Sequence, residues 1–149
     1  MTSPEPSRRN RLVYTVSRFA MLCVSKVWFR LRTEGSAHLP SDGPVLLVGN
    51  HSSYLDPPLM GMGVGRQVNF LAQAGLGSFG PLRWWLRQVG VTLIDRDAPS
   101  KDAMRWVGGR LKAGEVVGIF PEGTRSSDGH VMPFKGGVEF LVRRSKATV

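Results

Sequence analysis

The sequence is poor in the residues that build disulfides and metal sites. It has one cysteine, Cys23, in 149 residues, which excludes a disulfide within the chain and any zinc site built on cysteines. The three histidines, His38, His51 and His130, stand far apart, so no metal is expected. With 42% hydrophobic and 21% charged residues, the composition is that of an ordinary folded domain with its own hydrophobic core.

Acidic residues are also scarce. The 11 Asp and Glu residues stand against 20 Lys and Arg residues, which gives a net charge of +9. Such an excess indicates a partner with negative charge: nucleic acid, a phosphorylated ligand or an anionic membrane. Nucleic acid is the weakest of these hypotheses, because the basic residues are not interleaved with aromatic residues in a nucleic-acid-binding pattern.

No apolar run is both long enough and free enough of charge to cross a membrane. A spanning helix needs about 20 mostly uncharged residues, and the apolar segment 12–31 contains Arg18, Lys26 and Arg30. Its apolar residues recur every three or four positions, which predicts an amphipathic helix. The apolar stripe is formed by Leu12, Val16, Phe19, Cys23, Val27 and Leu31, and the opposite face by Arg11, Arg18 and Arg32.

Two interpretations of this helix stay open. Its basic residues, with Trp28 and Phe29 near one end, fit a helix that lies in a membrane surface. Alternatively, the stripe packs on the rest of the domain, because amphipathicity alone does not identify the surface that covers it. We therefore expect a basic tail and amphipathic helix over residues 1–32 and the main domain over residues 33–149.

Short apolar runs alternate with helical segments after a loop at residues 33–43. This alternation predicts an α/β domain with a mostly parallel or mixed sheet flanked by helices. The expected strands are 44–49, 68–72, 92–94 and 116–120, and the expected helices are 57–64, 80–89, 100–113 and 136–145. Another apolar run begins at Ala147, so we expect a domain that is incomplete at its C-terminus; the alternative is a frayed tail.

The first segment that contains candidate catalytic residues is Asn-His-Ser-Ser-Tyr-Leu-Asp at residues 50–56. It follows a predicted strand, and open α/β sheets bind ligands at the carboxyl ends of their strands. Imidazole exchanges protons near neutral pH, and a carboxylate bonded to one of its nitrogens fixes the tautomer. A turn between the strand and the following helix can bring His51 and Asp56 together in such a pair, which is equipped to take a proton from a substrate hydroxyl. Alternatively, Asp56 caps the helix that begins at Pro57, and His51 is an ordinary loop histidine.

The second segment is Phe-Pro-Glu-Gly-Thr-Arg-Ser at residues 120–126, which also follows a predicted strand. Gly123 permits a close approach of the backbone, Thr124 offers a hydroxyl, and Arg125 offers a bidentate fork for phosphate. Glu122 can orient Arg125. The alternative is a polar turn in which Glu122 and Arg125 form a surface ion pair of little energetic value.

Two further cations occupy similar positions. Arg96 follows the third predicted strand, and Lys135 stands at the start of a predicted helix, where a positive charge opposes the helix dipole. Together with His51 and Arg125, these residues place one base and three cations in the loops of one sheet. That combination suits a hydroxyl substrate that carries phosphate. For Arg96 alone, the alternative is a charge on a solvated loop.

In order and spacing, these segments resemble the motifs of the glycerolipid acyltransferases, and in particular the bacterial 1-acyl-sn-glycerol-3-phosphate acyltransferases. Residues 50–56 resemble the first motif, residues 90–96 the second and residues 120–126 the third. Residues 128–129 and 133–137 resemble the segment that follows the third motif. The resemblance extends over residues 34–146, and three motifs in the same order are highly specific.

The resemblance implies transfer of a fatty acyl group from acyl-CoA or acyl carrier protein to the hydroxyl of a lysophospholipid, with 1-acyl-sn-glycerol-3-phosphate as the expected acceptor and phosphatidic acid as the product. It implies that His51 is the general base and Asp56 its orienting partner. Acceptor contacts are implied for Arg96, Glu122, Gly123, Thr124, Arg125 and Lys135. No metal and no cofactor beyond the acyl carrier is implied.

The resemblance also places the protein at a membrane, on the cytoplasmic face of the bacterial inner membrane. Anionic lipids and coenzyme A account for the positive charge without nucleic acid. Gln73, Ala74 and Gly75 stand where the family commonly has a basic and an acidic residue, and the family's fourth motif is expected beyond Val149. Two alternatives therefore remain: a different acceptor lysolipid, or a module that binds anionic lipid without catalysis.

Overall fold

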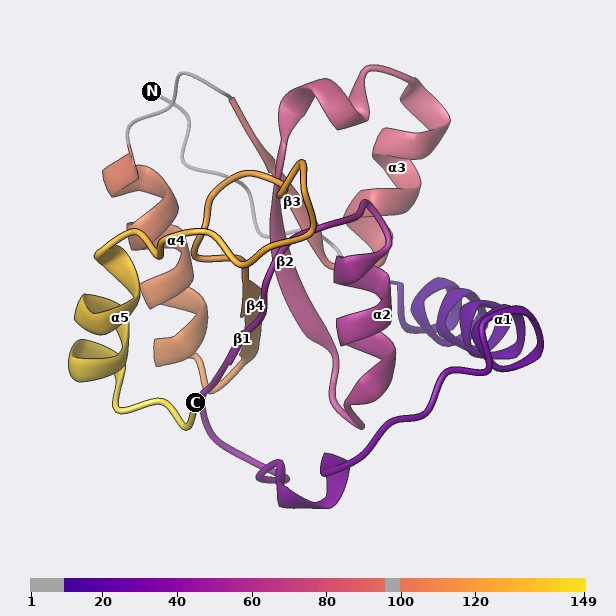
Figure 1. The fold of residues 1–149 in the computed structure, drawn as a ribbon, viewed down its shortest axis with the longest axis horizontal. Coiled ribbons are helices and arrows are strands. Elements are labelled where there is room, and N and C mark those ends of the chain that lie inside the picture. The colour runs from indigo at the N-terminus through magenta and orange to yellow at the C-terminus, as the bar shows by residue number, and fades with distance from the viewer. Residues whose placement is uncertain (1–9, 96–99) are drawn as a thin grey trace.

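The computed structural model describes residues 10–95 and 100–149, and helices and strands alternate along them as predicted (Figure 1). The α/β class is confirmed, and the element boundaries differ from the predicted ones by a few residues. The elements are α1 (Arg11–Trp28), β1 (Val45–Val48), α2 (Asp56–Gly63), β2 (Val68–Gln73), α3 (Gly80–Gln88), β3 (Val91–Ile94), α4 (Ser100–Lys112), β4 (Val116–Ile119) and α5 (Gly137–Ser145).

The four strands form one sheet in the order β1-β4-β2-β3, and every neighbouring pair is parallel. All four carboxyl ends therefore lie along the same edge of the sheet. Because β1 and β4 are adjacent, the loops that follow them, at residues 49–55 and 120–136, meet at this edge although they are far apart in the sequence. Helices α1, α2 and α3 lie on one side of the sheet and α4 and α5 on the other (Figure 1).

The core consists of two clusters, one on each face of the sheet. Successive strand residues point to opposite faces, so Val45 and Val116 belong to the cluster under α2, while Leu46 and Val117 belong to the cluster under α4 and α5. Burial of the strands on both faces explains their short, continuously apolar sequences. Gly118 contributes through its missing side chain, because a Cβ there would collide with the ring of Phe70.

Helix α1 docks on α2 and α3 through its polar face. The Arg18 guanidinium donates hydrogen bonds to the carbonyl oxygens of Met62 and Val64, at 3.3 and 2.9 Å, where α2 ends. Indole Nε1 of Trp85 on α3 donates to Ser17 Oγ at 2.9 Å. Ser25 is buried at 1% exposure. A cation at the C-terminal end of α2 also complements the dipole of that helix.

The predicted boundary of the first helix is wrong at its C-terminal end. The helix stops at Trp28 rather than at Leu31, and Arg30 has a positive φ of 49°, which no helical residue adopts. Arg32 consequently lies outside the helix and does not share a face with Arg18.

The apolar stripe of α1 faces away from the domain. Leu12, Phe19 and Val27 are 71%, 68% and 77% exposed, and Cys23 is exposed as well. The alternative in which this stripe packs on the rest of the domain is therefore wrong for the described residues. Among those residues, no helix combines the length and the apolar character that crossing a membrane requires.

The apolar run that begins at Ala147 joins the edge of the sheet. Thr148 forms an isolated parallel bridge with Val45, in which its N–H donates to Pro44 O at 3.1 Å and its carbonyl accepts from Leu46 N at 2.8 Å. Ala147 is buried within the cluster under α4 and α5. The frayed-tail alternative is therefore wrong for these residues.

Candidate active site

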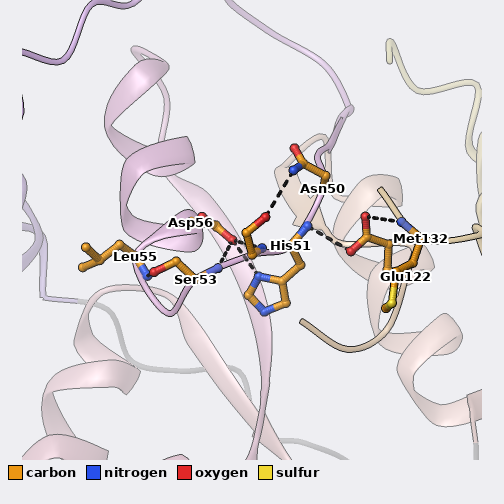
Figure 2. A network of polar contacts seen from close by, with 8 residues as sticks. Asn50, His51, Ser53, Leu55, Asp56, Glu122 and Met132 are labelled. Atoms are coloured by element: carbon orange, nitrogen blue, oxygen red, sulfur yellow. Dashed lines mark hydrogen bonds and ion pairs between the residues drawn. The ribbon is translucent and has the colours of Figure 1, made fainter. Parts of the chain in front are cut away.

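The loop between β1 and α2 brings His51 and Asp56 together. Nδ1 of His51 lies 2.9 Å from Oδ2 of Asp56, and both side chains are partly buried, at 19% and 23% exposure. Asp56 is the first residue of α2, and Pro57 and Pro58 follow it in the first turn, where their fixed φ suits a helix start. A turn between β1 and α2 thus brings the two side chains together, as predicted (Figure 2).

A single oxygen of Asp56 accepts all of its hydrogen bonds in this loop. Besides the imidazole, Oδ2 accepts from the backbone N–H groups of Ser52 and Ser53, each at 2.7 Å. Asp56 therefore bonds back to the loop before it, and no side chain caps α2. Burial acts to raise the pKa of the Asp56 carboxyl, but hydrogen bonds from Ser53, His51 and Ser52, with the charge of the imidazole, outweigh it and hold the pKa below its usual value.

The His51 ring is held from a second side by Phe120, the first residue after β4. The two rings stack with centroids 4.3 Å apart and an angle of 19° between their planes. Phe120 in turn stacks on Phe70, 6.4 Å away. The second imidazole nitrogen, Nε2, points away from Asp56 (Figure 2). A fixed imidazole with one nitrogen on a carboxylate and the other directed outward is equipped to accept a proton.

Glu122 is buried, at 3% exposure, and connects the site's loops. Its Oε2 accepts from the backbone N–H of His51 at 3.1 Å, and its Oε1 accepts from the backbone N–H of Met132 at 3.3 Å (Figure 2). Acceptor contact by Glu122 stays a prediction. Its contacts with described residues make it a support for the loop that carries His51, a role that the sequence did not indicate.

Arg125 does not pair with Glu122. Its Cζ lies 3.7 Å from the centroid of the Tyr54 ring, which belongs to the His51 loop. The predicted alternative of a Glu122–Arg125 surface ion pair is therefore wrong, because Glu122 points into the protein and bonds to backbone amides. The loop of Arg125 is fastened to the catalytic candidate itself, since Ser126 N–H donates to His51 O at 2.7 Å.

The remaining predicted site residues lie in the same loops, with one exception. Gly123 has a φ of +72°, and a Cβ on it would come within 2.6 Å of Lys135 Nζ, so the missing side chain leaves room for the ammonium group. Lys135 is also fixed by its backbone N–H, which donates to Pro121 O at 3.0 Å. Thr124 is exposed beside them. Arg96 lies outside the described residues.

Metal-ligating side chains do not gather anywhere in residues 10–95 and 100–149: no group of three or more His, Cys, Asp or Glu side chains could hold an ion. The site itself offers a histidine–carboxylate pair, a buried supporting carboxyl group and two cations, Arg125 and Lys135. This set suits base-assisted transfer to the hydroxyl of an anionic acceptor.

Comparison with known proteins identifies the family of this chain. A sequence model described as Acyltransferase matches residues 30–149. The match includes every element from β1 to α5 and all the site residues described above. The chain belongs to the acyltransferase family.

Several curated relatives carry the name 1-acyl-sn-glycerol-3-phosphate acyltransferase. The chloroplastic LPAT1 of Arabidopsis thaliana is 32% identical over 85% of this chain and 38% of its own length. The Bacillus subtilis protein is 30% identical over 74% of this chain and 55% of its own length, and the human alpha form is 38% identical over 80% and 44%. The chain thus spans between 38% and 55% of these relatives.

A solved structure shares the fold. The 1-acyl-sn-glycerophosphate acyltransferase PlsC of Thermotoga maritima superposes with a TM-score of 0.64, over 91% of this chain and 70% of that chain, at 24% identity. The parallel sheet with flanking helices is therefore the arrangement of a known acyltransferase fold.

We expect Glu122→Ala to destabilise the protein by about 2–4 kcal/mol, because two partly buried backbone N–H groups lose their charged acceptor. Glu122→Gln keeps one acceptor oxygen but presents an amide N–H₂ to a donor, so its loss should be intermediate. Urea denaturation gives the free energy of unfolding, and hydrogen exchange at the His51 amide locates the effect. The control Glu139→Gln removes an exposed ion pair with Arg143 and should change little. An equally small effect of Glu122→Ala would contradict the support role.

We expect Asp56 to make stability depend on pH at the acid end. Its pKa is lower in the folded chain than in the unfolded chain, so its contribution is complete above the ordinary carboxyl pKa of about 4 and is lost as pH falls through the folded value. The difference in unfolding free energy between wild type and Asp56→Asn should shrink as the pH falls from about 5 to below about 4. Urea denaturation across this acid range measures it, with the exposed Asp42→Asn as control. A difference that grows as the pH falls below about 4 would overturn the assignment.

Proposed function

We propose that the protein transfers a fatty acyl group from a thioester, acyl-CoA or acyl-carrier protein, to the hydroxyl of a lysophospholipid. The observation that carries the proposal is the His51–Asp56 pair at the carboxyl edge of the sheet, with the outer imidazole nitrogen directed away from the carboxylate (Figure 2). The names of the relatives support 1-acyl-sn-glycerol-3-phosphate as acceptor and phosphatidic acid as product.

His51 acts as general base in this proposal. The acceptor hydroxyl oxygen attacks the thioester carbonyl carbon while Nε2 takes the hydroxyl proton, a form of assistance worth about 10²–10⁴-fold in rate. Asp56 stabilises the imidazolium that forms. Collapse of the tetrahedral intermediate forms the ester and breaks the carbon–sulfur bond, and the imidazolium returns its proton to the leaving thiolate. A thioester is already activated, so the proposed reaction uses no metal and no further cofactor.

The cations of the site supply the headgroup contacts. The guanidinium of Arg125 offers a planar fork to a phosphate, and the ammonium of Lys135 adds a point charge above Gly123. Arg96 is proposed as a third phosphate contact. Thr124, exposed between these residues, offers a hydroxyl to the same headgroup.

Both proposed substrates carry fatty acyl chains, so we expect the enzyme to act at a membrane surface. Helix α1 offers an exposed apolar stripe that can contact such a surface. Its polar face is engaged with α2 and α3, and its apolar stripe, with Trp28 at 80% exposure, faces outward. A helix with a basic side and an apolar side lies in the headgroup boundary of a bilayer. We therefore propose that the protein works at an anionic membrane, and the resemblance to bacterial acyltransferases supports the cytoplasmic face of the bacterial inner membrane.

We expect His51→Ala to lower acyl transfer to 1-acyl-sn-glycerol-3-phosphate by at least about 10²-fold, because the hydroxyl then loses its base. Phosphatidic acid formed from acyl-CoA is measured in the natural protein that contains these residues, and circular dichroism checks that the fold is unchanged. His38→Ala, an exposed histidine in a separate turn, is the matched control and should retain activity.

Full turnover by His51→Ala would remove the base from the mechanism. Strong, salt-sensitive binding to anionic vesicles with no turnover by the wild-type protein, using acyl-CoA or acyl-carrier protein and a panel of lysolipids, would instead support a lipid-binding module without catalysis.

We expect the double variant Phe19→Ser, Val27→Ser to bind vesicles that contain anionic phospholipid at least about tenfold more weakly, because two exposed apolar side chains no longer enter the bilayer. Cosedimentation with the vesicles measures the partition coefficient. The control is Phe140→Ser, which removes an apolar side chain of similar exposure from α5, across the sheet. Equal losses in both variants would remove α1 from the proposed membrane surface.

A further inference from the structure

Among the described residues, the side chain of Arg125 contacts an aromatic ring. The guanidinium carbon lies 3.7 Å from the centroid of the Tyr54 ring, a distance at which the cation and the ring are in stacking contact. Within the part of the chain that the structure describes, no carboxylate lies at ion-pair distance from Arg125. The head of this long, exposed side chain is thus placed by Tyr54 rather than by a salt bridge.

Both members of the contact are anchored to the His51–Asp56 pair. Tyr54 follows Ser53, whose backbone N–H donates to Asp56 Oδ2 at 2.7 Å. Arg125 precedes Ser126, whose backbone N–H donates to His51 O at 2.7 Å. These short hydrogen bonds fix the backbone on either side of the stacked pair relative to the imidazole.

We infer that Tyr54 is a positioning residue for Arg125: its ring holds the guanidinium in place to receive the phosphate of the acceptor beside the His51 base. This inference deepens the proposed function and rests on it. Stacking engages the face of the guanidinium and leaves its N–H groups, which lie in the guanidinium plane, free for a bidentate contact. An acidic partner would have occupied those same N–H groups and lowered the charge offered to phosphate.

The exposure of Tyr54 fits this role better than a role in folding. The side chain is 65% exposed and belongs to neither hydrophobic cluster. Its hydroxyl makes no hydrogen bond among the described residues, so the ring face is the part that acts. Phenylalanine should therefore replace it, whereas leucine, which offers apolar bulk without a π face, should not.

The test is the KM for 1-acyl-sn-glycerol-3-phosphate with acyl-CoA as donor. Tyr54→Leu should raise this KM by about two- to fivefold, the range of an exposed cation–π contact, with kcat and the KM for acyl-CoA within about twofold of wild type. Tyr54→Phe should restore the wild-type KM. Phe140→Leu, which alters the Arg144–Phe140 contact on α5, is the matched control and should have no effect.

A double-mutant cycle separates positioning from a general effect on the loop. In an Arg125→Ala background, Tyr54→Leu should produce no further rise in KM, because there is no guanidinium left to place. Additive effects of the two substitutions, a Tyr54→Phe variant as impaired as Tyr54→Leu, or a fall in kcat at unchanged KM would each overturn the inference.

Failure of the proposed function is distinguishable from failure of this inference. Equilibrium binding of the same lysophospholipid without donor compares wild type and Tyr54→Leu in the absence of turnover. If the protein shows no turnover and Tyr54→Leu weakens binding, the result would support the role of Tyr54 in placing Arg125 and contradict the catalytic proposal. If Tyr54→Leu changes neither turnover nor binding, the result would contradict only the role of Tyr54 in placing Arg125. A wild-type protein that neither binds nor turns over this lipid would contradict both proposals.

Discussion

The site depends on one carboxylate oxygen. Oδ2 of Asp56 collects hydrogen bonds from two successive backbone amides, of Ser52 and Ser53, and from the imidazole of His51. Three donors on one acceptor define the path of the loop from β1 into α2 and the orientation of the ring at the same time. Such hydrogen bonds to an ionised group are stronger than neutral ones, and they leave the outer imidazole nitrogen as the group directed away from the loop.

The order of the strands brings a second loop against the His51 loop and so completes the site. Because β4 lies beside β1, the loop after β4 meets the His51 loop and supports it at three points: the Phe120 ring, the buried Glu122 carboxyl group and the backbone N–H of Ser126. The same loop carries Arg125, so the base and the cation are parts of one connected unit. A substrate that bridges them meets a geometry that is already formed, which lowers the entropic cost of reaching a reactive arrangement.

The sequence was sufficient to predict the fold class and the strands from alternating apolar runs and helical segments, and the His51–Asp56 pair from the resemblance of residues 50–56 to a known motif. It was not sufficient for contacts that depend on the direction of a side chain in a loop. Glu122 and Arg125 are three residues apart and of opposite charge, yet Glu122 points inward to backbone amides and Arg125 outward to Tyr54. The stack of His51 on Phe120 likewise depends on the order of β1 and β4, which no local pattern contains.

Helix α1 shows the same limit and leads to a functional argument. Its periodicity reports an apolar stripe and a polar face but not which of them meets the domain. Here the polar face does, through the guanidinium of Arg18 and the hydroxyl of Ser17, which bond to specific groups on α2 and α3. Directional hydrogen bonds of this kind fix the rotation of the helix about its own axis. If the outward stripe enters a bilayer as proposed, the same hydrogen bonds set the orientation of the whole domain, and with it of His51, relative to the membrane surface.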